Sequence, residues 1–350
     1  MSRRVHIVAV AARTAVGLTA EGTAAAVRAG VSRVGEHPFM VDAAGDMLKC
    51  GLAGGIAPTL FGADRMLALA QQALAEIVAK LTSQRPYPAP VRLLLALPEP
   101  RPGFSSEDAG RLVRKLGEVP PARLAGWRVE QTEAGHAGSL AGLERAVRDV
   151  GQGPDDLCLV GGVDSYLDAD TLDWLDSEKR LARAEIRSGF PPGEGAAMLA
   201  VASDAGRTAL GLPSLARVLT VACARDKRDP KGDEGLLGEG MTEALRRAIA
   251  TLRPPGEVLA DVYCDLNGER SRTDDWGFAL MRTATAFRDG TDYRTSISQC
   301  GEIGAASATL GCALAVQAWQ RGHANGPLAL VCGSSWTGLR GAAILEGGAA

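Results

Sequence analysis

Short apolar segments alternate with longer alanine-rich segments along the 350 residues of this chain. The short segments have the length of buried β-strands, and the longer ones carry apolar residues at helical spacing. This alternation is typical of an α/β protein whose sheets are covered by helices. The predicted strands are Val5–Val10, Val91–Leu97, Leu157–Gly161, Ala196–Ala202, Leu259–Cys264, Leu328–Cys332 and Ala342–Leu345, and the predicted helices are Ala63–Leu81, Ser106–Leu116, Ala137–Val150, Thr242–Leu252 and Gly304–Gln320.

A weak internal repeat constrains the fold further. The predicted helix Ala137–Val150 and the two strands after it correspond to the predicted helix Gly304–Gln320 and the two strands after it. Each helix follows a turn of small residues, Gly135–Ser139 in one case and Cys300–Ala306 in the other. Helix N-termini expose unpaired N–H groups, so they are places where nucleophiles and oxyanions are bound. If the two halves are related, we expect these two N-termini to converge on one crevice.

The expected boundary between the halves lies near Ser203–Leu212 and divides the chain into residues 1–205 and 206–350. The charged stretch Ala224–Gly235 is expected to be a surface loop, because it combines Gly and Pro with alternating charges.

Composition and charge exclude several classes of function. Lys plus Arg (38) nearly balance Asp plus Glu (41), which gives no charge signature for nucleic acid or an anionic membrane. The seven cysteines are scattered without a CxxC pattern, so we expect reduced thiols, no metal site and no cofactor. The apolar run Val5–Ala12 is too short for a membrane span and carries His6, so it is interpreted as a strand. We therefore expect a cytoplasmic protein without a membrane span.

Several motifs follow one another in a recognisable order. Along the chain they are TAVG at Thr14–Gly17, LCLVGGVDS at Leu157–Ser165, SGFPPGEGAA at Ser188–Ala197, GAASA at Gly304–Ala308 and SWTGLRG at Ser335–Gly341. In this order the chain resembles the β-ketoacyl synthases of the thiolase superfamily over nearly its whole length. The resemblance implies a five-layered α-β-α-β-α fold made of two similar halves, which is generally dimeric.

The catalytic residues of that family do not carry over. A ketosynthase uses a Cys thiolate at a helix N-terminus and two His residues that polarise the thioester carbonyl. By resemblance, the Cys position is His136 and the first His position is Asn267. The second His position is Gly301, or Glu302 if the register is shifted by one residue. The family's Lys shortly before the second His is also absent from Thr295–Gln299.

The remaining polar residues leave two interpretations open. His136 is either a base in the crevice or a polar side chain that fills the place of the Cys. Asn267 is either an oxyanion donor or part of an Asn-Gly turn. Cys300 or Glu302 would be the alternative reactive group, and Cys300 with His136 and Asn267 would form a Cys–His–Asn arrangement. Structural roles are expected for Glu194, Asp274, Asp275 and Trp336.

The resemblance implies a catalytically degenerate ketosynthase-like protein, a pseudoenzyme that acts by binding. It would form a homodimer, pair with another ketosynthase as a chain-length-factor-like subunit, or serve as an adaptor for an acyl carrier protein or other client. The alternative is an acyltransferase with altered chemistry on acyl thioesters. The alternating segment Trp127–Thr132, just before His136, is the expected edge strand for such an association.

Overall fold

The computed structural model describes residues 4–42, 45–57, 59–83, 86–118, 121–151, 157–183, 185–186, 188–227 and 237–348. The first half contains β1 (Val5–Thr14), α1 (Ala20–Arg28), β2 (Val34–Val41), β3 (Met47–Gly51), α2 (Gly62–Leu81), β4 (Tyr87–Ala96), α3 (Ser106–Glu118), β5 (Leu124–Gln131), α4 (Gly138–Asp149), β6 (Leu157–Ser165), α5 (Ala169–Ser177), β7 (Glu194–Ser203) and α6 (Asp204–Leu210). The second half contains β8 (Ala216–Arg225), α7 (Glu239–Ile249), β9 (Asp261–Tyr263), α8 (Arg270–Thr283), β10 (Tyr293–Arg294), α9 (Ile297–Cys300), α10 (Ser307–Gln320), β11 (Leu328–Ser334) and β12 (Leu339–Gly347).

Ten strands of the described residues form one sheet in the order β10-β9-β11-β12-β8-β1-β7-β6-β4-β5. The hairpin β2–β3 is separate from this sheet. From the outer edge inwards, the first half contributes β5, β4, β6, β7 and β1, and the second half contributes β10, β9, β11, β12 and β8. Strands at the same place in the two halves therefore also come at the same place in the chain order of each half. The halves join where β1 pairs with β8, from Val5 opposite Val218 to Ile7 opposite Ala216. The predicted repeat is confirmed by this shared strand order. The division into residues 1–205 and 206–350 stays a prediction.

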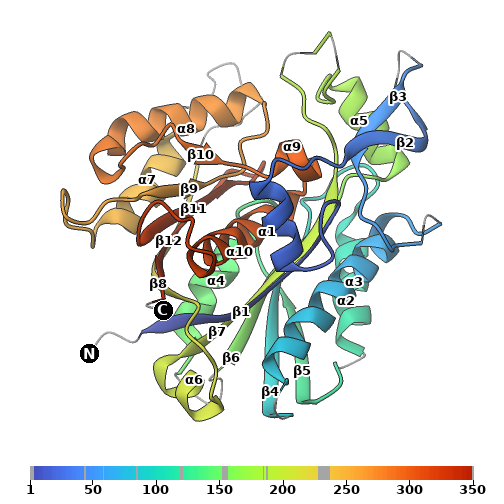
Figure 1. Ribbon diagram of the computed structural model, residues 1–350. Coiled ribbons are helices and arrows are strands. Elements are labelled where there is room, and N and C mark those ends of the chain that lie inside the picture. Colours follow the sequence, from blue (N-terminus) through green and yellow to red (C-terminus); the bar gives the residue numbers. More distant parts are fainter. Residues whose placement is uncertain are drawn as a thin grey trace.

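The helices form three layers around the two halves of the sheet (Figure 1). Helices α2 and α3 cover the outer face of the first-half strands, and α7 and α8 cover the outer face of the second-half strands. Helices α4 and α10 lie between the two sets of strands. The predicted five-layered α-β-α-β-α fold is therefore confirmed.

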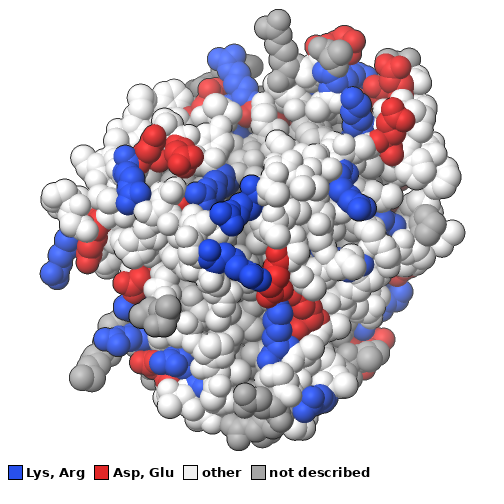
Figure 2. Space-filling model, in the orientation of Figure 1, with Lys and Arg blue, Asp and Glu red and all other residues white. Residues whose placement is uncertain are grey.

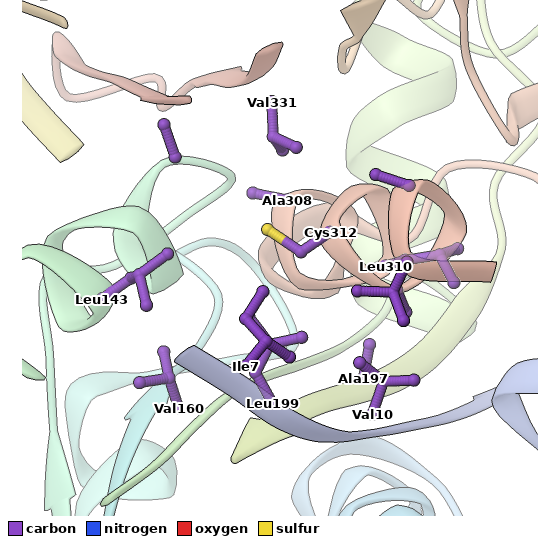
Figure 3. Packing of buried hydrophobic residues seen from close by; sticks show 14 of the residues in the cluster. Ile7, Val10, Leu143, Val160, Ala197, Leu199, Ala308, Leu310, Cys312 and Val331 are labelled. Atoms are coloured by element: carbon purple, nitrogen blue, oxygen red, sulfur yellow. The ribbon is translucent and has the colours of Figure 1, made fainter. Parts of the chain in front are cut away.

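The central layer is apolar and closely packed. Helix α10 is apolar around almost its whole circumference, which is the pattern of a helix that is buried on all sides. Small residues let the layers approach, since a Cβ atom at Gly162 of β6 would overlap the carbonyl of Ala305 just before α10. Side chains from four strands and both central helices meet there, as Figure 3 shows for Ile7, Val10, Leu143, Val160, Leu199, Leu310, Cys312 and Val331.

Some predicted boundaries differ from the structure. The helix predicted over Gly304–Gln320 starts with a 3₁₀ turn and is α-helical only from Ser307. The strand predicted over Leu259–Cys264 is reduced to β9. Strand β8 and helix α8 were not predicted, because β8 is only partly buried with an arginine near each end and α8 is rich in charged residues. Residues 228–236 of the predicted surface loop lie outside the described residues.

Candidate functional site

His136 lies in the tight connection between β5 and α4. The turn depends on Gly135, which has a φ of 80° and no room for a Cβ atom beside Glu99 and Ser335. Helix α4 begins two residues later, so His136 lies at its N-terminus. The His136 side chain is buried, with 2% of the residue exposed.

Glu302 approaches His136 from the second half of the chain. It follows Gly301, which turns the chain with a φ of 73°, and its N–H donates to the Pro191 carbonyl at 2.8 Å. Glu302 Oε1 lies 3.1 Å from His136 Nε2. Gly301 has no side chain to contribute, so the residue that contacts His136 is Glu302. Which of the two corresponds to the family's second His stays a prediction.

Asn267 completes this group from the loop between β9 and α8. Its Nδ2 donates to Glu302 Oε2 at 2.8 Å and to Glu269 Oε2 at 3.0 Å. Its Oδ1 accepts from the Glu269 N–H at 3.1 Å, so the side chain also closes its own turn. The prediction that the two helix N-termini converge, with Asn267 beside them, is confirmed by these contacts. The chemical role of each residue stays a prediction.

Arg272 of α8 lies at the centre of a buried ion network. Its Nη2 lies 3.2 Å from His136 Nε2, and its Nε lies 3.2 Å from Glu269 Oε2. Its Nη1 forms an ion pair with Asp265 and donates to the Ser334 carbonyl at 2.8 Å. The residues of this network are each less than a tenth exposed: Arg272, His136, Glu269 and Asp265. A charge of this kind is tolerated inside a protein only when it is paired and fully hydrogen-bonded.

Arg180 and Trp336 close the outer side of this network. Arg180 Nε donates to Glu269 Oε1 at 2.8 Å, and its guanidinium carbon lies 3.7 Å from the centre of the Trp336 ring. The Trp336 N–H donates to Glu99 at 2.8 Å, and the Thr337 N–H donates to the same carboxylate. The loop that carries Trp336 is therefore fixed over the site by a carboxylate from the other half of the chain.

Three N–H groups at the two helix N-termini already have acceptors. The Ala137 N–H donates to Ser335 Oγ at 3.0 Å. The Gly304 N–H donates to Glu302 Oε1 at 2.9 Å, and the Ala305 N–H donates to Asp164 Oδ2 at 3.0 Å. These are the donors that would otherwise be free to hold a bound oxyanion.

The open space at the site is small. A cavity of about 20 Å³ lies beside Asn267, Gly301 and Glu302. A second cavity, also of about 20 Å³, lies beside Arg272, Ser335 and Trp336. Such a volume holds about one water molecule, whereas pockets for organic ligands measure roughly 300–1,000 Å³.

Cys300 is separated from this group. It is fully buried at the end of α9 and belongs to the apolar central cluster. Burial raises the pKa of its thiol to about 11, opposed by hydrogen bonds with Thr14 and the Val16 backbone. Among the described residues no hydrogen bond joins Cys300 to His136 or Asn267. A protonated thiol in an apolar cluster does not support the Cys–His–Asn arrangement.

Two acidic residues have structural contacts. Glu194 forms a two-point ion pair with Arg65 and accepts from the Ala53 N–H at 2.8 Å. Asp275 Oδ2 accepts from Arg340 Nε at 2.6 Å, and both residues are 1% exposed. The latter pair fixes α8 to β12, which in turn positions Arg272.

Sequence reasoning found His136, Asn267 and Glu302 but missed Glu99, Arg180, Glu269 and Arg272. The missed residues lie in segments rich in charge, which are usually solvent-exposed. The signal that points to them is the spacing of Glu269 and Arg272, three residues apart and directly after Asn267. Neither a group of side chains that could hold a metal ion nor a helix long and apolar enough to cross a membrane occurs in the described residues.

The Glu302 carboxyl makes stability depend on pH. Burial alone raises its pKa, but His136, Arg272 and the Gly304 N–H together lower it below the ordinary value of 4.5. The ionised carboxylate thus stabilises the fold above about pH 4.5, and this contribution disappears as the pH falls further. In urea unfolding from pH 7 to pH 3, the advantage of wild type over Glu302→Gln in free energy of unfolding should begin to shrink below about pH 4.5 and go on shrinking towards pH 3. Glu107→Gln, on the exposed side of α3, is the control. A difference in stability between wild type and Glu302→Gln that does not change with pH would contradict the lowered pKa of Glu302.

Solved structures with the same fold come from polyketide biosynthesis. The ishigamide ketosynthase/chain length factor matches with a TM-score of 0.83 and 17% identity, over 100% of both chains. A type II polyketide synthase ketosynthase in complex with its acyl-carrier protein matches with a TM-score of 0.78 and 14% identity, over 100% of both chains. The module 6 ketosynthase of the bacillaene synthase from Bacillus subtilis 168 matches with a TM-score of 0.77 and 15% identity, over 99% of this chain and 72% of that one.

No family model and no curated protein matches the sequence. The structural matches establish that this chain has a ketosynthase-like fold. His136, Asn267 and Glu302, the candidates for the family's Cys and His positions by resemblance, meet at one site in it.

Proposed function

We propose that this chain acts by association, as a chain-length-factor-like subunit or adaptor, and that it catalyses neither condensation nor malonyl decarboxylation. One observation carries the proposal: the His136–Glu302–Asn267 group is tied into a closed ion network by Arg272. Condensation needs a thiolate and free donors for the thioester oxygen. The site offers neither, because the side chains of His136, Asn267, Glu302 and Arg272 are already bonded to one another.

The comparisons support the choice of partner. One similar structure is a ketosynthase/chain length factor, and another is a ketosynthase with its acyl-carrier protein. A partner ketosynthase, a second copy of this chain or a carrier protein therefore fits the proposal. Such partners belong to the cytoplasm, where the seven free thiols of this chain would stay reduced.

The free edge of β5 is the surface proposed for association. Strand β5 is the end strand of the sheet and pairs only with β4 among the described strands. The Thr132 N–H donates inward to the Leu95 carbonyl at 2.9 Å. Because N–H groups alternate along a strand, the Val129 and Gln131 N–H groups point to the open edge. Such an edge is a template for pairing with another strand.

A second candidate function is acyl-thioester chemistry with His136 as a general base. The contact of 3.1 Å between His136 and Glu302 favours it, because a carboxylate orients a catalytic imidazole in many enzymes. The cavities of about 20 Å³ oppose it, since a thioester carbonyl has no room to reach the imidazole.

Product analysis separates the two functions. The purified chain is incubated with malonyl- and acyl-carrier thioesters, and carbon dioxide release and condensation products are measured. We expect rates equal to those of a blank without protein. Turnover by the wild type that disappears in His136→Ala would overturn the proposal.

A further inference from the structure

A cavity of about 500 Å³ lies on the outer face of the first half of the chain. It is bounded by α2, by the end of α3 and by the loop that leads into β5, and α2 and α3 lie beside each other there (Figure 1). Sites for organic ligands measure roughly 300–1,000 Å³, so this volume is large enough for one. The two cavities beside Asn267 and Arg272 hold only about 20 Å³ each.

One face of α2 forms the long wall of the cavity. Its lining residues follow one another at helical spacing, as Gln71, Leu74, Ala75, Val78, Ala79 and Thr82. Leu74 and Val78 are buried at 5% exposure, whereas Ala75 and Ala79 are exposed. Because the alanine side chains are short, they leave room beside the larger apolar ones. An apolar molecule in this space would be removed from water against an apolar wall.

The opposite wall is fixed by hydrogen bonds to the backbone. Trp127 Nε1 donates to the carbonyl of Leu116, which lines the cavity from α3, at 3.0 Å. The Tyr87 N–H donates to the carbonyl of Arg123, which lines it from the loop, at 2.9 Å. The cavity is therefore formed in advance, and a ligand would not have to order these segments in order to bind.

Arg123 supplies the charge at the cavity. It is exposed, and the other described residues that line the cavity are uncharged. The second cation at this end of α2, Lys80, is neutralised by Glu21 at 2.8 Å and Glu76 at 2.6 Å. Figure 2 shows red and blue side chains next to one another over the surface between α1 and α2. Arg123 differs from other exposed arginines in that it borders an apolar cavity, where its guanidinium can pair with an acidic group of a bound molecule.

We propose that this cavity binds a small organic anion, whose apolar body lies against Leu74 and Val78 and whose single acidic group pairs with Arg123. This binding site goes beyond the association proposed above and does not depend on it. The cavity is bounded by α2 and α3, whereas the association uses the open edge of β5.

Two fluorescent probes with the same aromatic rings test the proposal. Anilinonaphthalene sulfonate carries one negative charge, and phenylnaphthylamine lacks the sulfonate. Each is titrated into the folded chain and excited directly, because its emission rises in an apolar site. We expect saturable binding of one sulfonate probe per chain, with an affinity about tenfold or more above that of the neutral probe.

Two variants separate the apolar wall from the charge. Ala79→Trp fills the cavity from an exposed position and should abolish binding of the sulfonate probe. Ala25→Trp, on the exposed side of α1, adds the same ring elsewhere and should bind like wild type. Arg123→Gly should weaken binding of the sulfonate probe about tenfold or more and leave that of the neutral probe unchanged.

Arg123→Gly also excludes damage to the fold as the cause of weaker binding. Arg123 has a φ of 72° in a turn closed by the Leu124 N–H and the Pro121 carbonyl at 3.3 Å, and this conformation favours glycine. The variant should therefore melt at no lower a temperature than wild type. Equal affinities of wild type for the two probes, full binding of the sulfonate probe by Ala79→Trp, or no saturable binding by wild type would each overturn the proposal.

Discussion

Arg272→Leu is expected to lower the free energy of unfolding by about 3–5 kcal/mol, because it leaves the buried Asp265 carboxylate without a cation and removes one of the two arginines that pair with Glu269. Arg272 is the cation that contacts Asp265 and Glu269 and also lies against His136. Urea unfolding of the purified variant at neutral pH measures the loss.

Arg270→Leu is the matched control on the same helix. Arg270 is 87% exposed in its side chain, and its ion pair in the described part of the chain is with Asp274, one turn along the helix. Its loss should change stability by about 0.5 kcal/mol or less. Equal losses in the two variants would contradict the role of Arg272 as the centre of a buried network.

Val129→Pro is expected to convert a dimer of this chain into a monomer without unfolding it. Proline removes the N–H at the open edge of β5 but leaves the inward bond from Thr132 to Leu95 in place. A specific interface at this edge should bury more than about 1,000 Å² in total. Light scattering after size-exclusion chromatography measures the change in mass.

Val129→Thr retains the N–H and the β-branched shape, so it should remain a dimer. If the natural partner is a different ketosynthase, the isolated wild type should be partly monomeric and should dimerise when that partner is added. A wild type that is a stable monomer, with a mass unaffected by Val129→Pro and by any added ketosynthase, would rule out this edge as the interface.

The fold was predictable because its signals are local and ordered. The glycine-rich motifs at Leu157–Ser165 and Ser188–Ala197 occur in the family's order, and the repeat relates the helices before β6 and β11. The strand order within each half depends on pairings between distant segments, so sequence periodicity does not determine it. Strand β8 was missed for a related reason: it joins the two halves and is only partly buried.

The positions of the site residues were predictable, but their chemical environment was not. The positions of His136 and Asn267 were predicted from their distance along the chain to the motifs that resemble those of the family. That Glu302 rather than Gly301 contacts His136 required the structure, because a difference of one residue along the chain decides it. The roles of Arg180 and Arg272 depend on ion pairs with residues in other segments. Their local sequences are rich in charge and would fit an exposed loop equally well.

A site closed by its own ion network should not take up an acyl group. Intact-mass spectrometry after incubation with acyl- and malonyl-carrier thioesters tests this closure, because a nucleophilic side chain that reached the thioester carbonyl would keep the acyl group. We expect the mass of the unmodified chain for wild type, His136→Ala and Cys300→Ser alike. An acyl adduct on the wild type that maps to His136 or Cys300, and is lost in the corresponding variant, would contradict the closure.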